Sequence, residues 1–265
     1  MTTLNTFDPN MHLQTISIVG LGGTGAQIAR SVARMVYDMK VARLHTPQIV
    51  LIDPDRVEQK NVGRQLYVEA DVGQPKAHVL MRRFNMALGL DIVAIDQPVK
   101  AEAHFERWGN LIVGAVDNHL ARRELANIRG AVWIDSGNHF NAGQVVIGNT
   151  GDYETLMRGI DGQNGRYAYL PHAGLLFPSL LEPEPETKPQ AEPERSCADL
   201  VAAREQDLLT NDWMAVTAAQ YVYRLLHRQP ITSFVSYVSA DGMNVRSVLI
   251  CRDELLAYLP QPVAA

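Results

Sequence analysis

The stretch TISIVGLGGTGAQIARSVARMV, residues 15–36, joins an apolar run to an amphipathic pattern through a glycine-rich turn. TISIV, at 15–19, is rich in β-branched residues and is typical of a buried strand. Apolar side chains then recur at helical spacing, which predicts a helix over 24–39. The glycines of GLGGTG permit a tight turn and let backbone N–H groups approach a phosphate at the helix N-terminus. The stretch therefore predicts a strand–turn–helix unit that opens an α/β domain.

The same alternation of strands and helices continues outward along the first 150 residues. Further apolar, β-branched runs stand at 48–52, 91–95, 111–116 and 131–134, and helical patterns cover 76–88 and 212–227, the latter with Val216 on its apolar stripe. This alternation is typical of a mainly parallel sheet with helices on both faces. The tail ITSFVSYVSADGMNVRSVLI, 231–250, predicts two strands around a turn. We therefore predict a Rossmann-like α/β fold with a C-terminal antiparallel hairpin.

Composition limits the classes of protein to which the chain can belong. Its 265 residues, 46% of them hydrophobic, suffice for one larger α/β domain. A formal net charge of −5 makes a nucleic-acid partner unexpected, because such a surface needs clustered Lys and Arg. The first residues do not resemble a signal peptide and no apolar run matches a membrane span, so we expect a cytoplasmic protein. With two distant cysteines, Cys197 and Cys251, we expect no zinc.

Polar side chains crowd the segments that follow three of the predicted strands. Two carboxylates, Asp53 and Asp55, come directly after the second strand. Lys76 begins the 76–88 helix, where the helix dipole disfavours a cation, so we do not expect its role to be purely structural. The other members of the set are Asn61, Arg64, Gln65, Asp117 and Asn118. Because ligands of parallel sheets bind outside the carboxyl ends of the strands, we expect these groups to surround one site.

Two nucleotides compete for a site of this composition. A glycine loop followed by an acid is most often a dinucleotide site, although Asp53 comes later than the usual spacing of about 20 residues. The cations Arg64 and Lys76, together with a carboxylate that suits Mg²⁺ at Asp117, fit the triphosphate of ATP better. The acids also have a structural interpretation, in which Asp53 and Asp55 cap the next segment and Asp117 is a helix N-cap.

The motifs together resemble the ThiF/MoeB family of ubiquitin-activating-like adenylating enzymes. The likeness rests on GxGGxG at 20–25, DxD at 53–55, NxxRQ at 61–65, GQPK ending at Lys76 and DN at 117–118. It covers about 15–148, and within the family the chain is most similar to the ThiF-like proteins encoded in PRTRC plasmid gene clusters. The resemblance implies a homodimer that uses ATP and Mg²⁺ to adenylate the C-terminal carboxylate of a small ubiquitin-like (β-grasp) or sulfur-carrier protein.

The resemblance also implies a role for each residue of the motifs. Asp53 would hold the ribose, Asp117 would bind Mg²⁺, and the phosphates would be held by Asn61, Arg64 and Lys76. Gly22 and Gly23 would allow close backbone approach, and the site would further include Asp55, Gln65 and Asn118. Arg64 and Asp117 are expected to be catalytic. Dimers of the family often complete each site with an N-terminal arginine, whereas the first arginine of this chain is Arg30, inside the first helix.

Cys197 is the third residue that we expect to be catalytic. It follows the segment LEPEPETKPQAEPERS, 181–196, whose Pro- and Glu-rich composition cannot build a core. Ser196 and Asp199 have capping-box spacing, which makes Cys197 the first helical residue, and the helix dipole and Arg195 both favour its thiolate. By resemblance, the thiolate would attack the acyl-adenylate and form a thioester. The alternative is a small buried helix residue.

We therefore predict a single adenylation domain over 1–265. It would have a flexible crossover loop at about 150–196 and a helix–hairpin extension at about 197–265. Two other functions stay open: adenylation of a small-molecule or tRNA-attached carboxylate, and a catalytically silent nucleotide-binding scaffold. A nicotinamide-dependent oxidoreductase is the last alternative.

Overall fold

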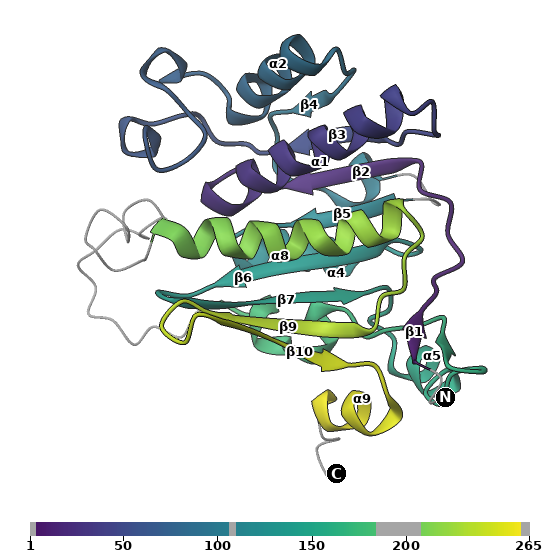
Figure 1. The fold of residues 1–265 in the computed structure, drawn as a ribbon. Helices are drawn as coiled ribbons and strands as arrows, with labels where there is room; N and C mark the ends of the chain where they lie inside the picture. The colour runs from purple at the N-terminus through teal and green to yellow at the C-terminus, as the bar shows by residue number, and fades with distance from the viewer. Residues whose placement is uncertain (1–3, 106–109, 184–207, 261–265) are drawn as a thin grey trace, which may run out of the picture.

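The computed structural model describes residues 4–105, 110–183 and 208–260. Their main feature is one eight-stranded sheet of order β10-β9-β7-β6-β5-β2-β3-β4 (Figure 1). Five neighbouring strands run parallel: β2 (Thr15–Val19), β3 (Gln48–Ile52), β4 (Val93–Ile95), β5 (Asn110–Gly114) and β6 (Val132–Asn138). Three strands extend the sheet in antiparallel fashion: β7 (Ala142–Gly148), β9 (Ser233–Ser239) and β10 (Asn244–Leu249). The predicted mainly parallel sheet and C-terminal hairpin are confirmed.

Helices cover both faces of this sheet, as predicted. On one face, α1 (Gly23–Val41) packs against both α2 (Lys76–Leu88) and the long α8 (Leu208–Leu226) (Figure 1). The opposite face carries α4 (His119–Ala126), which packs against α6 (Ala173–Leu176) and the short 3-10 helix η3 (Pro178–Leu181). Within the described ranges, no helix combines the length and apolar character needed to cross a bilayer.

The apolar sequence of the central strand explains its place in the sheet. β2 has neighbouring strands on both sides and packs against α1, and Ile16 and Ile18 are fully buried. From β2 the chain builds β3 and β4 on one side, then crosses to form β5 on the other side. This reversal opens a crevice at the carboxyl ends of β2 and β5, where ligands of open α/β sheets bind.

The chain after residue 150 contains elements that the sequence did not suggest. They include α5 (Tyr153–Arg158) and β8 (Arg166–Tyr167), which pairs in parallel with β1 (Thr6–Phe7). Near the C-terminal end of the described chain, the short helix α9 spans Arg252–Tyr258. Three further short elements lie before residue 150: η1 (Gln59–Asn61), η2 (Glu69–Asp71) and α3 (Ala101–His104). Cys197, together with most of the Pro- and Glu-rich segment, lies outside the described residues. The division of the chain into a domain, a crossover loop and an extension stays a prediction.

Candidate functional site

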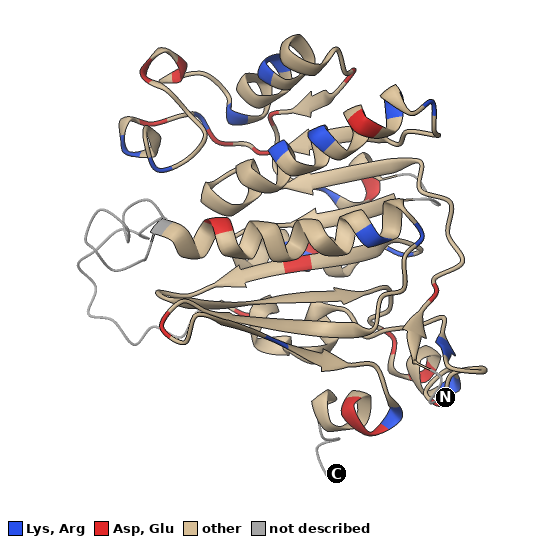
Figure 2. Ribbon diagram, in the orientation of Figure 1, with Lys and Arg blue, Asp and Glu red and all other residues tan. Residues whose placement is uncertain are grey.

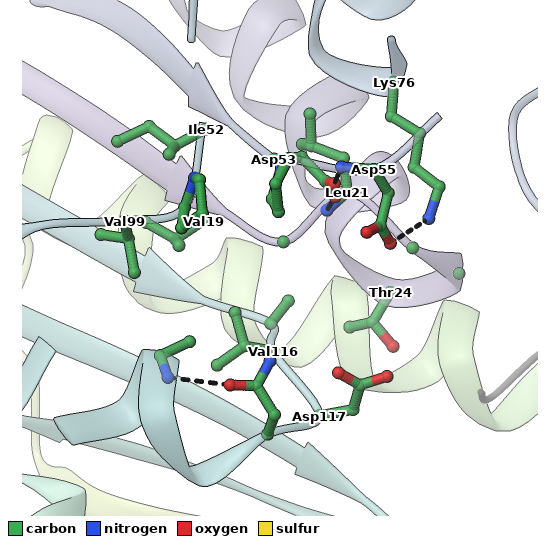
Figure 3. A pocket seen from close by; sticks show the side chains of 18 of the residues that line it. Val19, Leu21, Thr24, Ile52, Asp53, Asp55, Lys76, Val99, Val116 and Asp117 are labelled. Carbon is green, nitrogen blue, oxygen red and sulfur yellow. Dashed lines mark hydrogen bonds and ion pairs between the residues drawn. The ribbon is translucent and has the colours of Figure 1, made fainter. Parts of the chain in front are cut away.

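A pocket of about 510 Å³ opens at the carboxyl ends of β2, β3 and β5. Its volume falls in the usual range for small-molecule sites. Figure 3 shows Val19, Ile52 and Val99 gathered at one end and the charged groups of Lys76 and Asp117 at the other. The pocket therefore has an apolar end and a charged end.

The glycine loop between β2 and α1 forms one wall of the pocket. Gly20 has a φ of +83°, and a Cβ at Gly25 would lie only 1.8 Å from the Gly20 carbonyl oxygen, so both positions require glycine. The N-cap of α1 is Gly22, which has no side chain to bond the first-turn N–H groups. Since Gly22, Gly23 and Thr24 all line the pocket, the positive end of this 19-residue helix is available to an anion.

The peptide groups of Leu21 are held from both sides by residues that follow β3. Asp53, only 4% exposed, accepts a hydrogen bond from the Leu21 N–H to Oδ2 at 2.5 Å and another from the Asp55 N–H to Oδ1 at 2.8 Å. The Tyr67 hydroxyl donates to the Leu21 carbonyl at 2.8 Å. Asp53 and Tyr67 thus fix the glycine loop, and no sequence motif pointed to Tyr67.

Burial controls the protonation of these two side chains. It raises the pKa of Asp53 above its ordinary 3.8, while the charge of Lys76 and the two backbone N–H donors act in the opposite direction. Burial, aided by the nearby Asp53 carboxylate, also raises the pKa of Tyr67 well above 10. Tyr67 therefore remains a hydroxyl donor at any ordinary pH.

Lys76 and Asp55 form an ion pair at the charged end of the pocket. Lys76 Nζ lies 2.9 Å from Asp55 Oδ2, and the lysine side chain is 8% exposed whereas that of Asp55 is 64% exposed (Figure 3). Figure 2 shows that the loops between β3 and α2 carry charges of both signs. Because the carboxylate faces solvent, the lysine can share its charge with an incoming anion.

The polar residues of the NxxRQ motif lie in different surroundings. Asn61 is buried and lines the pocket, but its Oδ1 accepts from the Glu58 N–H at 2.8 Å and so has a structural task as well. Gln65 also lines the pocket, and its buried Oε1 has no hydrogen-bond partner among the residues that the structure describes. Arg64 is half-buried and is not among the lining residues, so its contact with a nucleotide stays a prediction.

The segment between β5 and α4 forms another wall of the pocket. Asn118 is the N-cap of α4, with its Oδ1 accepting from the Ala121 N–H at 2.8 Å, so the interpretation of Asp117 as the N-cap is wrong. Asp117 is exposed, lines the pocket and accepts no hydrogen bond from the described part of the chain. Within that part, no three His, Cys, Asp or Glu residues gather into a metal-binding group. A single carboxylate fits Mg²⁺, which usually takes its other ligands from phosphates and water.

A buried ion pair fixes α4 behind this wall. Arg122 Nε lies 3.5 Å from Asp135 Oδ1 on β6, and both side chains are nearly sealed from solvent. Burial raises the pKa of Asp135 above 3.8, and the charge and hydrogen bond of Arg122 oppose this shift. Since α4 begins directly after Asn118, the pair positions the helix that follows Asp117.

The chain belongs to the ThiF family, because residues 10–254 match the sequence model of that family. Escherichia coli MccB with AMPCPP and MccA superposes with a TM-score of 0.53 at 16% identity, over 97% of this chain and 66% of MccB. MccB with ATP gives 0.51 at 16% identity, over 90% and 65%. PaaA gives 0.53 at 15% identity, over 89% and 64%.

These likenesses to solved structures concern the fold. The chain spans 64–66% of the length of the MccB and PaaA chains just described. No protein of curated function matches it. The resemblance to the ThiF/MoeB family is confirmed, and the narrower likeness to the proteins of PRTRC gene clusters stays a prediction.

Proposed function

We propose that this protein adenylates the C-terminal carboxylate of a small ubiquitin-like (β-grasp) or sulfur-carrier protein at the expense of ATP. The observation that carries the proposal is the polarity of the pocket, with an apolar end, a buried acid in the middle and a charged end on an open helix N-terminus. The apolar end suits the adenine base of ATP, the buried acid suits the ribose hydroxyls, and the charged end suits the phosphates. MccB, solved with ATP and with AMPCPP plus MccA, supports a nucleotide site beside a second molecule in this fold.

The nucleotide would lie along the pocket from the valines to Asp117. Val19, Ile52 and Val99 offer an apolar wall to adenine. Asp53 would accept from the ribose, because each of its oxygens keeps a lone pair beyond the backbone hydrogen bond that it accepts. The phosphates would meet the α1 N-terminus and the Lys76 ammonium group, with Arg64 approaching from the adjoining loop.

The reaction is an attack of a carboxylate oxygen on the α-phosphorus of ATP. A new phosphorus–oxygen bond joins AMP to the acyl group, the bond to the β-phosphate oxygen breaks, and pyrophosphate leaves with the bonding electrons. No side chain has to move a proton, so the protein contributes positioning and charge neutralisation. The N–H groups at Gly22 and Gly23 and the charge of Lys76 oppose the negative charge that develops. Mg²⁺, held at Asp117, would neutralise phosphate charge.

The remaining features of the proposal concern partners. We propose a homodimer, as the family resemblance implies, in the cytoplasm, and a thioester at Cys197 as a following step. Light scattering at micromolar concentration tests the first, with a purely monomeric species contradicting it. An acceptor that is a small molecule or a tRNA-attached carboxylate is the main alternative, since nothing in the pocket selects a protein.

ATP–pyrophosphate exchange tests the proposal. With the correct small Gly-ended protein, wild type should exchange label, and Asp117→Ala and Arg64→Ala should each lose about 10²–10³ in rate while staying folded. Asp38→Ala, which removes an exposed carboxylate near the far end of α1, is the matched control and should keep the wild-type rate. Wild-type rates in both site variants would refute adenylation at this pocket. ATP binding without exchange for any carboxylate would favour the silent scaffold, and tighter binding of NADH than of Mg-ATP would favour the oxidoreductase.

A further inference from the structure

Helix α8 brings an asparagine to the pocket from the far end of the chain. Asn211 lies in the first turn of α8, lines the pocket and is only 6% exposed. It is 187 residues away from Thr24, the residue of the first turn of α1 that it contacts. Figure 1 shows α1 and α8 side by side with their N-terminal ends pointing the same way, and the two helices pack together. Two long helices therefore direct their positive ends to one place.

Hydrogen bonds fix the orientation of the Asn211 amide. Its Oδ1 accepts from the Thr24 hydroxyl at 3.0 Å and from the side-chain amide of Asn138, which follows the buried part of β6. With the oxygen occupied by two donors, the Nδ2 group must point the other way. A Cβ on Gly23 would lie 2.8 Å from Nδ2, so this group lies against the glycine loop. Nδ2 donates to no acceptor in the described ranges.

We propose that Asn211 Nδ2 donates a hydrogen bond to a phosphate oxygen of the nucleotide at the N-terminus of α1. Asn211 is more than nine-tenths buried, and the amide donor of such a residue is expected to have an acceptor when the pocket beside it is filled. Gly22 and Gly23 line the same pocket, no side chain caps the N-terminus of α1, and the combined helix ends favour an anion there. Thr24 and Asn138 are positioning residues, because they hold the amide in the donating orientation.

The proposal rests on the proposed nucleotide site and adds a phosphate-reading residue to it. It predicts that Asn211 affects ATP according to the phosphates that the ligand carries. Adenosine, which has none, should not depend on the Nδ2 group. A residue with only a structural role would change the affinities for ATP and adenosine alike.

Asn211→Asp separates these two roles. The carboxylate has nearly the same shape and can still accept from Thr24 and Asn138, but it replaces the Nδ2 donor by a negative oxygen. Calorimetry on the full chain should compare ATP, ADP, AMP and adenosine. We expect ATP affinity to fall about 10- to 100-fold, the scale of a lost hydrogen bond to a charged group. Adenosine affinity should change less than about twofold. If the aspartate variant folds poorly, Asn211→Ala replaces it in the same assay and should show a loss of ATP affinity of the same size, again with little change for adenosine.

Asn110→Asp is the matched control. Asn110 is also buried and its Oδ1 accepts from the Thr15 hydroxyl, but it lies at the amino ends of β2 and β5, away from the pocket. This variant should leave all four affinities unchanged. Unchanged ATP affinity in both Asn211 variants, or equal losses for ATP and adenosine, would overturn the proposal. If wild type binds ATP and Asn211→Asp shows the phosphate-dependent loss but no exchange is found, adenylation fails and the Asn211 contact stands.

Discussion

Replacing Tyr67 by phenylalanine removes one hydroxyl group from the support of the glycine loop. The Tyr67 ring is 2% exposed, and its hydroxyl donates to the carbonyl of the fully buried Leu21 at 2.8 Å. Tyr67→Phe leaves that carbonyl buried without its donor, which costs about 1–3 kcal/mol of the free energy of unfolding. Asp53 still holds the Leu21 N–H, so we expect the loop to keep its fold but to lose one of its two attachments.

The same loss should appear in nucleotide binding. If about 1.4 kcal/mol of the cost falls on the bound conformation of the loop, ATP affinity drops tenfold. Urea unfolding and calorimetry with ATP measure the two quantities on the same variant.

Tyr221→Phe is the control for this prediction. Tyr221 is also buried and its hydroxyl bonds Ser233 and Ser236, but it lies on α8 among residues that do not line the pocket. It should lose stability without losing ATP affinity. Wild-type stability and affinity in Tyr67→Phe, or equal losses of affinity in both variants, would refute the role of Tyr67.

Three further predictions follow from single positions. Gly25→Ala should lower the free energy of unfolding measured in urea by about 1–3 kcal/mol, because its Cβ would lie 1.8 Å from the Gly20 oxygen. The Cβ of Gly159→Ala meets no backbone atom closer than 3.8 Å and only the edge of the Tyr169 ring at 3.2 Å, so this variant should lose less; equal losses would contradict the steric argument. Burial lowers the pKa of His172 below 6.5, so the folded state favours the neutral imidazole ring. The stability that the neutral ring contributes is complete above pH 6.5. It is lost as the pH falls from 6.5 toward the lowered pKa, by at most about 1.4 kcal/mol per pH unit. His172→Asn keeps an acceptor for the Leu175 N–H and should flatten this part of a stability–pH curve; an unchanged slope would contradict it. On a non-reducing gel with ATP and the carrier, a thiol-sensitive adduct should form in wild type and in Cys251→Ala. It should vanish in Cys197→Ala, while pyrophosphate exchange survives; an adduct that persists in Cys197→Ala would exclude a thioester at Cys197.

Local patterns sufficed for the parallel half of the sheet and its first helices. TISIV and QIVLI became β2 and β3 with the predicted bounds, and the stripe over 76–88 became α2. In each case the chemistry of one short segment determines both its structure and its burial. The same holds for the glycine loop, where sterics allow few other residues.

Local patterns are a weaker guide where burial depends on partners that are distant in the chain. The apolar stripe that the sequence predicts for α8 includes Val216, yet this residue is 60% exposed. The buried face of the helix, which packs against α1 and the sheet, is shifted around the helix and mixes alanines with larger residues: Met214, Ala215, Ala218, Ala219, Tyr221 and Val222. A stripe that is predicted from large apolar residues alone therefore missed a buried face in which half of the apolar residues are alanines.

The candidate site likewise contains residues that sequence motifs identify and residues that only the folded chain reveals. Motifs identified Asp53, Lys76 and Asp117, which the pocket brings together although they follow different strands. Tyr67 and Asn211 could not be identified, because their tasks are set by contacts with Leu21 and Thr24 that only the folded chain creates. Asp117 and Asn118 are both good N-cap residues, so local chemistry alone could not tell which of them caps α4.

Transfer of label from α-labelled ATP tests the central claim most directly. The full chain is incubated with Mg-ATP and a small Gly-ended carrier protein, and the products are separated under mildly acidic conditions. Adenylation predicts that labelled AMP becomes attached to the C-terminal carboxylate of the carrier with release of pyrophosphate, and that Lys76→Met abolishes this labelling. An unlabelled carrier, with ATP either intact or cleaved to labelled ADP and phosphate, would contradict the claim.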